Sequence, residues 1–207
     1  MYQYIKRLFD IILSLVALII LAPLIFITTI IVKSTSKGPV FFKGSRIGYN
    51  GKPFSVIKFR TMFIEADPIM HNEYIMNLTN KGLGAKRGNE IFKLKNDPRI
   101  TQVGRFLRRY GLDELPQFIN VLKGNMSFIG PRPPIKFEYE AYKDLQDERL
   151  KVKPGITGLW QVSGRNILTY DRMIELDLYY IKNISFILDL KILIRSIFAP
   201  FKGYGAL

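Results

Sequence analysis

The first part of the chain is dominated by one long apolar run. No charged side chain occurs among the 22 residues from Ile11 to Val32. As a single helix with a rise of about 1.5 Å per residue, this run would be roughly 33 Å long, close to the thickness of the hydrocarbon core of a bilayer. Pro23 lies near its middle and removes a helical hydrogen bond, so we expect a bend there. The pattern predicts a broken membrane helix.

Basic residues flank this run on both sides. Lys6 and Arg7 precede it, and four more follow it closely: Lys33, Lys37, Lys43 and Arg46. Because cytoplasmic flanks are enriched in lysine and arginine, both ends are expected on the cytoplasmic side. A re-entrant hairpin that enters and leaves through one leaflet fits this symmetry better than a kinked spanning helix, although the spanning helix stays open. We therefore expect a re-entrant membrane anchor over 1–36 and a cytosolic catalytic domain over 37–207.

After the anchor, the spacing of the apolar positions changes. Between Gly38 and Met62, short runs of aromatic and β-branched residues are separated by a turn sequence from Tyr49 to Lys52, which predicts a β-hairpin. The next stretch, 63–96, has no clear period and contains several glycines, so we expect a partly helical, mobile insertion there.

The second half of the chain has helical spacing. It predicts five helices, which cover 100–110, 113–123, 135–151 and two segments that divide near 183–185. Asp113 occupies the N-cap position of the second helix. The last helix, Phe186 to Phe198, suits a helix lying in the headgroup layer, and a core helix is an equal alternative. The expected fold is α+β and mostly helical, with one short β-hairpin and amphipathic interfacial helices in a small cytosolic domain.

Composition narrows the chemistry. Lysine and arginine number 31 against 17 aspartate and glutamate residues, and this net charge of +14 predicts attraction to nucleic acids, phospholipid headgroups or nucleotide phosphates. The chain has no cysteine, which excludes disulfides, thiolate metal sites and a cysteine nucleophile. His71 is the single histidine and has no recognisable partner motif, so neither a histidine-rich metal site nor a Ser–His pair is favoured.

The most distinctive candidate chemistry is the acidic pair Asp113 and Glu114. Neighbouring residues at a helix N-terminus point in different directions, so they do not form the facing carboxylates of a glycosidase. A carboxylate can instead attack phosphorus where cations neutralise the phosphate oxygens, and Arg108 lies within about a turn of the pair. Farther along, two prolines stiffen the backbone around Arg132, which could meet a phosphate. Taken alone, however, the acidic dipeptide is explained more simply as a helix cap.

Several longer segments, in order along the chain, resemble one known family. They are KFRTM at 58–62, NDPRIT at 96–101, LDELPQFINVLKGNMSFIGPRP at 112–133, KPGITGLWQVSGR at 153–165 and DLYYIKNISFILDLKIL at 177–193. Together with the N-terminal run they cover nearly the whole chain. In this combination the sequence resembles the monotopic phosphoglycosyl transferases, the bacterial sugar transferase family.

The resemblance implies an active site at the cytoplasmic face of the bacterial inner membrane. It implies that Asp113, beside Mg²⁺, takes a sugar phosphate from a UDP-sugar and releases UMP, after which polyprenyl (undecaprenyl) phosphate accepts the sugar phosphate. Glu114 is then expected to deprotonate or orient the acceptor phosphate. The residues expected around the phosphates and nucleotide are five cations and one polar support: Lys58, Arg60, Arg108, Arg132, Arg165 and Asp177.

The resemblance also sets the expected partners. Membrane lipids should bind the basic surface, at about 1 kcal/mol per residue near anionic headgroups, and nucleic acid is not expected. The transferred sugar, the glycan pathway and a homodimer stay open. Two other classes of function also stay open. A membrane-tethered nucleic-acid-binding module predicts that Asp113→Asn leaves binding intact, and an inactive glycan-assembly scaffold predicts that no phosphosugar is trapped on Asp113.

Overall fold

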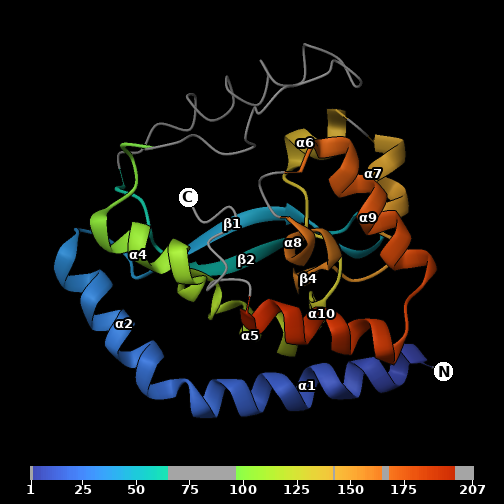
Figure 1. Cartoon of the computed structure of the whole chain (residues 1–207). Coiled ribbons are helices and arrows are strands. Elements are labelled where there is room, and N and C mark those ends of the chain that lie inside the picture. The colour runs from blue at the N-terminus through green and yellow to red at the C-terminus, as the bar shows by residue number, and fades with distance from the viewer. Residues whose placement is uncertain (1, 65–96, 142, 165–167, 199–207) are drawn as a thin grey trace.

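The computed structural model describes residues 2–64, 97–141, 143–164 and 168–198 (Figure 1). A bent pair of helices follows one edge of a mostly helical body, which holds two small two-stranded sheets. The expected α+β, mostly helical class is therefore confirmed. Arg165 and nearly all of the expected insertion over 63–96 lie outside the described residues.

The N-terminal segment forms two helices, α1 (Tyr2–Ile20) and α2 (Ala22–Thr35), with a bend of 63° between them. Pro23 lies in the first turn of α2, where its missing N–H is tolerated, so the predicted bend is confirmed. Within the described ranges, no helix alone has the length and hydropathy needed to cross a bilayer, whereas α1 and α2 pass that test together as a bent pair. The outer faces of both helices expose large apolar side chains, among them Ile19 and Phe26.

The predicted hairpin is present. It consists of β1 (Phe41–Ile47), the 3-10 turn η1 (Tyr49–Gly51) and β2 (Pro53–Phe59). The strands are antiparallel, and Ile47 pairs with Pro53 next to the turn. Asn50 has a φ of 53°, in the left-handed region that asparagine tolerates better than most residues. The predicted hairpin and the place of its turn are therefore confirmed.

Helix α4 (Gln102–Tyr110) follows the predicted bounds closely. The hydroxyl of Thr101 caps it by accepting a hydrogen bond from the N–H of Gly104 at 2.8 Å. A Cβ at Gly104 would lie 2.1 Å from the carbonyl oxygen of Thr61, so glycine is required for the close approach of α4 to the segment after β2. Gly111 ends the helix with a φ of 71°.

The prediction of one helix capped by Asp113 is wrong. Residues Leu112–Glu114 form a 3-10 turn, η2, and α5 (Gln117–Leu122) begins only after Pro116. Pro116 has no N–H to give to the carbonyl of Leu112, and the N–H of Leu115 takes that carbonyl at 3.3 Å instead. Asp113 therefore lies inside a tight turn and does not cap a helix.

The C-terminal half contains two features that the pattern missed, a parallel pair of strands and a short helix over Leu159–Ser163 within a segment expected to be a loop. The elements are β3 (Ser127–Ile129), α6 (Lys136–Ala141), α7 (Lys143–Arg149), β4 (Gly155–Thr157), α8 (Leu159–Ser163), α9 (Tyr170–Lys182) and α10 (Phe186–Phe198). Strands of three residues are too short to show alternation, which is why β3 and β4 escaped the sequence analysis. The predicted division between the last two helices is confirmed.

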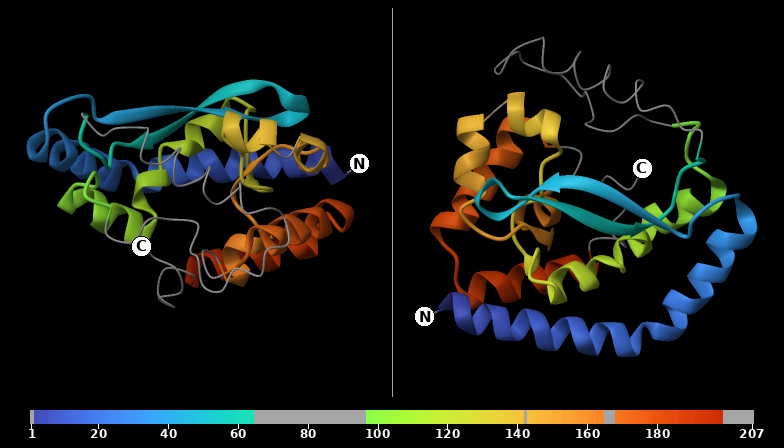
Figure 2. Two further views of the ribbon diagram at one scale, coloured as in Figure 1. Left: turned by 90° about the horizontal axis from the view of Figure 1, so that it is seen from above. Right: turned by 180° about the vertical axis from the view of Figure 1, so that it is seen from behind.

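Three buried clusters organise the described part of the chain. One joins β3, α8, α9 and α10 through Ile129, Leu159, Tyr180 and Ile192. Helix α10 thus has a core face, yet its other face exposes large apolar side chains such as Ile187 and Phe198. The expected core helix is confirmed for one face, whereas a position in the headgroup layer stays a prediction. Figure 2 shows the hairpin on one side of the molecule and helices α4 and α10 on the other.

Candidate functional site

The acidic pair lies in the η2 turn, between two leucines that anchor the turn to the body of the protein. Leu112 and Leu115 flank Asp113 and Glu114, and both leucines pack against a cluster contributed by α2, β2 and α4: Val32, Phe59 and Leu107. The turn is therefore tied to three elements at once, including the second arm of the bent helix pair. The LDEL sequence supplies this anchoring because leucines three residues apart return to the same side of a 3-10 turn.

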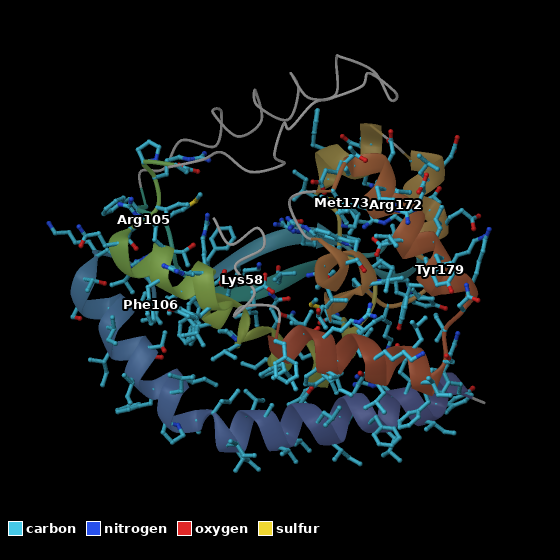
Figure 3. The ribbon with its side chains drawn as sticks, viewed as in Figure 1. Lys58, Arg105, Phe106, Arg172, Met173 and Tyr179 are labelled. Carbon is cyan, nitrogen blue, oxygen red and sulfur yellow. The ribbon has the colours of Figure 1, made fainter. Side chains whose placement is uncertain are left out.

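Glu114 lies in an open depression that we call the cationic pocket. Its polar lining comes from Arg46, Lys58, Glu114, Gln117, Arg132 and Gln161. The ammonium group of Lys58 donates a hydrogen bond to Oε1 of Glu114, and the two side chains are 28% and 34% exposed. Figure 3 shows Lys58 near the middle of the molecule, between α4 and the C-terminal helices. The ion pair is formed, yet a ligand can reach both partners.

Arg46 and Arg132 bring two like charges to this pocket. Burial, together with the neighbouring Arg132, lowers the pKa of Arg46 to about 10, against the opposing influence of Glu138 and Glu114. Two guanidinium groups at close range repel each other, and an anion between them relieves that repulsion. With Lys58 the pocket holds three cations, a set suited to phosphate groups.

Arg46 was not expected in the site. From sequence alone it belongs only to the basic flank of the membrane run. The hairpin register contains the missing signal, because Arg46 pairs with Phe54 and Lys58 pairs with Phe42. Residues opposite each other, and residues two apart on a strand, share a face of the sheet, so Arg46 and Lys58 lie on one face.

Asp113 occupies a different environment from its neighbour. It is 8% exposed and is not among the described residues that line the cationic pocket, so the two adjacent carboxylates have separate surroundings. Arg108 is the nearby cation: burial lowers its pKa, and the charges of Asp113, Asp97 and Glu114 oppose that change, with Asp113 the strongest of the three. The Nε of Arg108 donates to the hydroxyl of Thr61 at 2.8 Å, which fixes the direction of the guanidinium group.

Arg60, another predicted binding residue, lies away from the pocket. It is 7% exposed, and its Nη2 donates to the carbonyl of Ser36 at 2.7 Å and to the hydroxyl of the same residue at 2.8 Å. A longer bond of 3.3 Å reaches the carbonyl of Val32. In this position Arg60 joins the segment after β2 to the C-terminal end of α2.

Asp177 is buried completely and pairs with Arg149. Burial raises the pKa of Asp177 to about 6, although Arg149 favours the ionised form. Arg149 also donates to the carbonyl of Arg132 at 3.2 Å and to Oε1 of Gln146 at 2.6 Å. Asp177 is therefore placed to hold Arg149, which in turn supports the backbone at Arg132.

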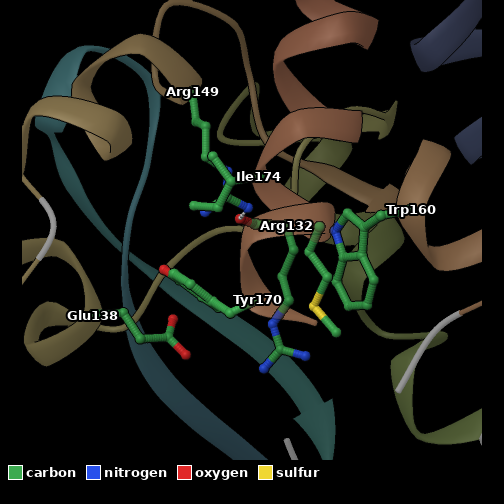
Figure 4. Close-up of a pocket in the computed structure, with 7 residues that line it drawn as sticks. Arg132, Glu138, Arg149, Trp160, Tyr170 and Ile174 are labelled. Carbon is green, nitrogen blue, oxygen red and sulfur yellow. Dashed lines mark hydrogen bonds between the residues drawn. The ribbon is translucent and has the colours of Figure 1, made fainter. Parts of the chain in front are cut away.

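A second, smaller depression lies beside this network, and we call it the aromatic pocket (Figure 4). It is lined by Arg132, Glu138, Trp160, Tyr170 and Met173, together with Arg149 and Ile174. Arg132 lines both depressions and thus stands between them. The hydroxyl of Tyr170 accepts a hydrogen bond from Gln146 at 2.6 Å, so the Asp177 network also reaches this wall.

The acidic pair is a candidate place for a divalent cation. Within the described part of the chain, no group of three or more acidic or histidine side chains could hold a metal ion. Mg²⁺, however, commonly keeps several waters and binds through one or two carboxylates together with substrate phosphates. Asp113 beside a pocket suited to phosphates fits that mode as a single protein ligand.

Comparison with known proteins adds a separate line of evidence. Residues 1–203 match the family model described as Bacterial sugar transferase. The undecaprenyl-phosphate galactose phosphotransferase of Salmonella typhimurium is 43% identical over 204 residues, which cover 99% of this chain and 42% of that protein. The UDP-glucose:undecaprenyl-phosphate glucose-1-phosphate transferase of Klebsiella pneumoniae is 43% identical over 209 residues, covering 97% of this chain and 41% of that protein.

A shorter relative matches along most of its own length. The exopolysaccharide production protein ExoY of Sinorhizobium fredii is 39% identical over 192 residues, which cover 93% of this chain and 83% of that protein. This chain thus spans about two fifths of the Salmonella and Klebsiella proteins and corresponds to most of the Sinorhizobium one.

Proposed function

Because the chain belongs to the bacterial sugar transferase family, as its motifs led us to expect, we propose that it moves a sugar 1-phosphate from a UDP-sugar to undecaprenyl phosphate. UMP is the other product. The reaction takes place at the cytoplasmic face of the inner membrane and begins the assembly of a polysaccharide. The names of the Salmonella and Klebsiella relatives support the substrate class, and the name of the Sinorhizobium relative supports the pathway type.

The observation that carries the proposal is the separation of the two adjacent carboxylates. Asp113 is held in a tight turn near Arg108, whereas Glu114 lies in a pocket with three cations. A nucleophile and an acid–base group need different surroundings, because one must reach phosphorus with its charge balanced by a cation while the other must exchange a proton. A helix cap, the simpler explanation from sequence, does not account for this arrangement.

In the first step an oxygen of Asp113 attacks the phosphorus that bears the sugar. A bond forms between this oxygen and phosphorus, the bond from phosphorus to the bridging oxygen breaks, and UMP leaves with the electron pair. Lys58, Arg46 and Arg132 bind the phosphates, and Arg108 reduces the repulsion between the phosphate charges and Asp113. Mg²⁺ bound at Asp113 would add Lewis-acid stabilisation of the phosphate charge.

In the second step a phosphate oxygen of the lipid acceptor attacks the same phosphorus. Asp113 is the leaving group and regains its carboxylate, and the product is a sugar diphosphate linked to the lipid. Glu114 takes or orients the proton of the acceptor phosphate. Lys58 is the counter-ion of Glu114 before the donor binds, and it can turn to the donor phosphates afterwards, because both side chains are accessible.

The test is a screen of UDP-sugars for UMP release with undecaprenyl phosphate and Mg²⁺, using wild-type protein and Asp113→Asn. We expect one or a few UDP-sugars to give UMP, and Asp113→Asn to give none. Mass spectrometry of protein quenched without acceptor should show one sugar phosphate bound to Asp113.

Other outcomes would point elsewhere. UMP formation that persists in Asp113→Asn would contradict the covalent route. Release of no UMP from any donor, together with salt-sensitive binding of nucleic acid, would favour the nucleic-acid-binding module.

A further inference from the structure

Helix α1 carries a polar stripe along an otherwise apolar surface. Tyr2, Lys6, Asp10 and Ser14 follow one another at four-residue intervals and therefore share one face, with Arg7 beside them. Asp10 is 4% exposed and Ser14 is 0% exposed. The remaining faces of α1 expose large apolar side chains. The buried stripe faces the body of the protein, which lies along α1 in Figure 1.

Arg7 binds the C-terminal end of α5. Its Nη1 donates to the carbonyl of Val121 at 2.6 Å, and its Nη2 donates to the carbonyl of Leu122 at 2.9 Å. The last carbonyls of a helix have no partner within the helix, so a cation there is favourable. The other end of α5 follows the η2 turn that holds Asp113 and Glu114.

Two further contacts attach α1 to other elements. Oδ1 of Asp10 accepts hydrogen bonds from the hydroxyl of Ser127 at 3.1 Å and from the N–H of Phe128 at 3.0 Å, both in β3. Oδ2 of Asp189, in α10, accepts from the hydroxyl of Tyr2 at 2.6 Å and from Lys6 at 2.7 Å. The stripe thus holds α5, β3 and α10 with charged or polar groups that are mostly buried.

These contacts give the basic residues before the membrane run a different role from the one expected. Lys6 and Arg7 were expected to mark a cytoplasmic end of the membrane run. The side chain of Lys6 is only 16% exposed and is paired with Asp189, and Arg7 is bonded to α5. Both cations therefore act within the protein, in contrast to a residue such as Lys33 on α2, which is exposed.

The position of α5 matters for the site as a whole. Asn120 of α5 accepts a hydrogen bond from the N–H of Ile57 at 2.9 Å and donates one to the carbonyl of Ser55 at 2.7 Å. Through Asn120, α5 holds the strand that carries Lys58. A shift of α5 would therefore move the acidic turn and the cationic pocket together.

We propose that the polar stripe of α1 is a positioning device, in which Arg7 sets the place of α5 and thereby of Asp113 and Glu114 relative to the membrane-facing surface. The acidic pair is then located by protein contacts and not by the depth at which lipids hold the anchor. The docking of α1 is independent of the reaction, whereas its effect on turnover rests on the proposed function.

Three variants test the device. Arg7→Gln removes the cation that spans the two carbonyls, and Arg7→Lys keeps the charge with a single donor group. Lys33→Gln is the matched control, because it also removes one basic flank residue, but one whose hydrogen bond, to the carbonyl of Gly38, is exposed and 3.4 Å long.

The first readout is independent of activity. The chain has no cysteine, so spin labels can be placed at Tyr4→Cys on α1 and Leu145→Cys on α7, both exposed. In lipid nanodiscs we expect one narrow distance distribution for the otherwise unchanged chain and for Lys33→Gln, and a broadened or shifted one for Arg7→Gln. An unchanged narrow distribution in Arg7→Gln would overturn the proposal.

The second readout separates positioning from loss of structure. For Arg7→Gln we expect kcat with undecaprenyl phosphate to fall about 100-fold, the cost of a small misplacement of reacting groups, while KM for the UDP-sugar changes little. Arg7→Lys should recover part of kcat. A loss that follows only the folded fraction, without recovery by lysine, would also overturn the proposal. If the wild-type protein released no UMP, the proposed function would fail, and the distance measurement would still decide whether Arg7 docks α1.

Discussion

Two ion pairs, each of one basic and one acidic side chain, lie in the two halves of the protein and differ in their surroundings. Lys58 and Glu114 join β2 to the η2 turn, with side chains 28% and 34% exposed. Arg149 and Asp177 join α7 to α9, with side chains 7% and 1% exposed. A pair that is about one-third exposed contributes little to stability and can exchange partners, whereas a buried pair becomes costly when one partner is removed. The contrast indicates that burial separates a pair open to a ligand from a supporting one.

The largest expected effect is on catalysis, in the exposed pair. Glu114→Gln should reduce kcat for UMP release by about 10²- to 10⁴-fold, the usual contribution of an acid–base group. The free energy of unfolding should change by less than about 1 kcal/mol, because the pair is open to solvent. Glu148→Gln is the control, since Glu148 pairs with Lys151 on the exposed surface of α7. Equal activity of the two variants would remove Glu114 from the mechanism.

The next effect is on stability, in the buried pair. Arg149→Ala should lower the free energy of unfolding by about 3–5 kcal/mol, because the carboxylate of Asp177 is left buried without its cation. Arg172→Ala, which breaks the exposed pair with Glu175, should cost less than about 1 kcal/mol. Chemical denaturation of the detergent-solubilised chain measures both. If the two variants were equally stable, the distinction drawn from burial would be wrong.

A smaller effect is expected on donor binding. Lys58→Met should raise KM for the UDP-sugar by about 10- to 100-fold, which corresponds to the roughly 1.5–3 kcal/mol of a hydrogen bond to a charged group. Lys43→Met removes a lysine from an exposed position on β1 and should leave KM unchanged. Steady-state kinetics on the active donor compares the variants. An unaltered KM in Lys58→Met would mean that Lys58 serves only Glu114.

The smallest effect is a pH dependence of stability in the buried pair. The pKa of Asp177 is about 6 in the folded protein, whereas the pKa of an aspartate in the unfolded chain is about 4. Between these values the folded state binds more protons, so the contribution of Asp177 to the free energy of unfolding rises as pH falls from 7 toward 4. This contribution to stability is lost as the pH rises through 6. Denaturation at several pH values should show this slope in the wild-type chain and not in Asp177→Asn.

The local sequence was sufficient for most of the elements. The turn from Tyr49 to Lys52 predicted the hairpin, Gly111 marked the end of α4, and the segment near Asn183 divided the last two helices. Each of these depends on backbone conformations or spacings encoded within a few neighbouring residues. The helix capped by Asp113 was wrong because one proline redirected the hydrogen bonds of the turn.

The candidate site was predicted in part. Lys58, Glu114 and Arg132 do meet in one pocket, and Asp113 with Arg108 lies beside it. The roles proposed for these residues remain predictions, and Arg165 lies outside the described residues. Arg60 and Asp177 are buried among protein partners, where they support other elements. Nothing in the local sequence showed whether these two side chains bind substrate or bind other parts of the protein, because the exposure of a residue depends on what packs over it.

The sequence by itself determined the apolar N-terminal run and its bend, the hairpin, most of the helices and the family. These follow from composition, periodicity and turn residues, which act over short distances along the chain. Only the tertiary structure decided that Arg46 shares a pocket with Lys58, that Glu114 and Asp113 have separate environments, and that Lys6 and Arg7 bind the body of the protein. Those facts join residues far apart in the chain, so they depend on packing that no local pattern contains.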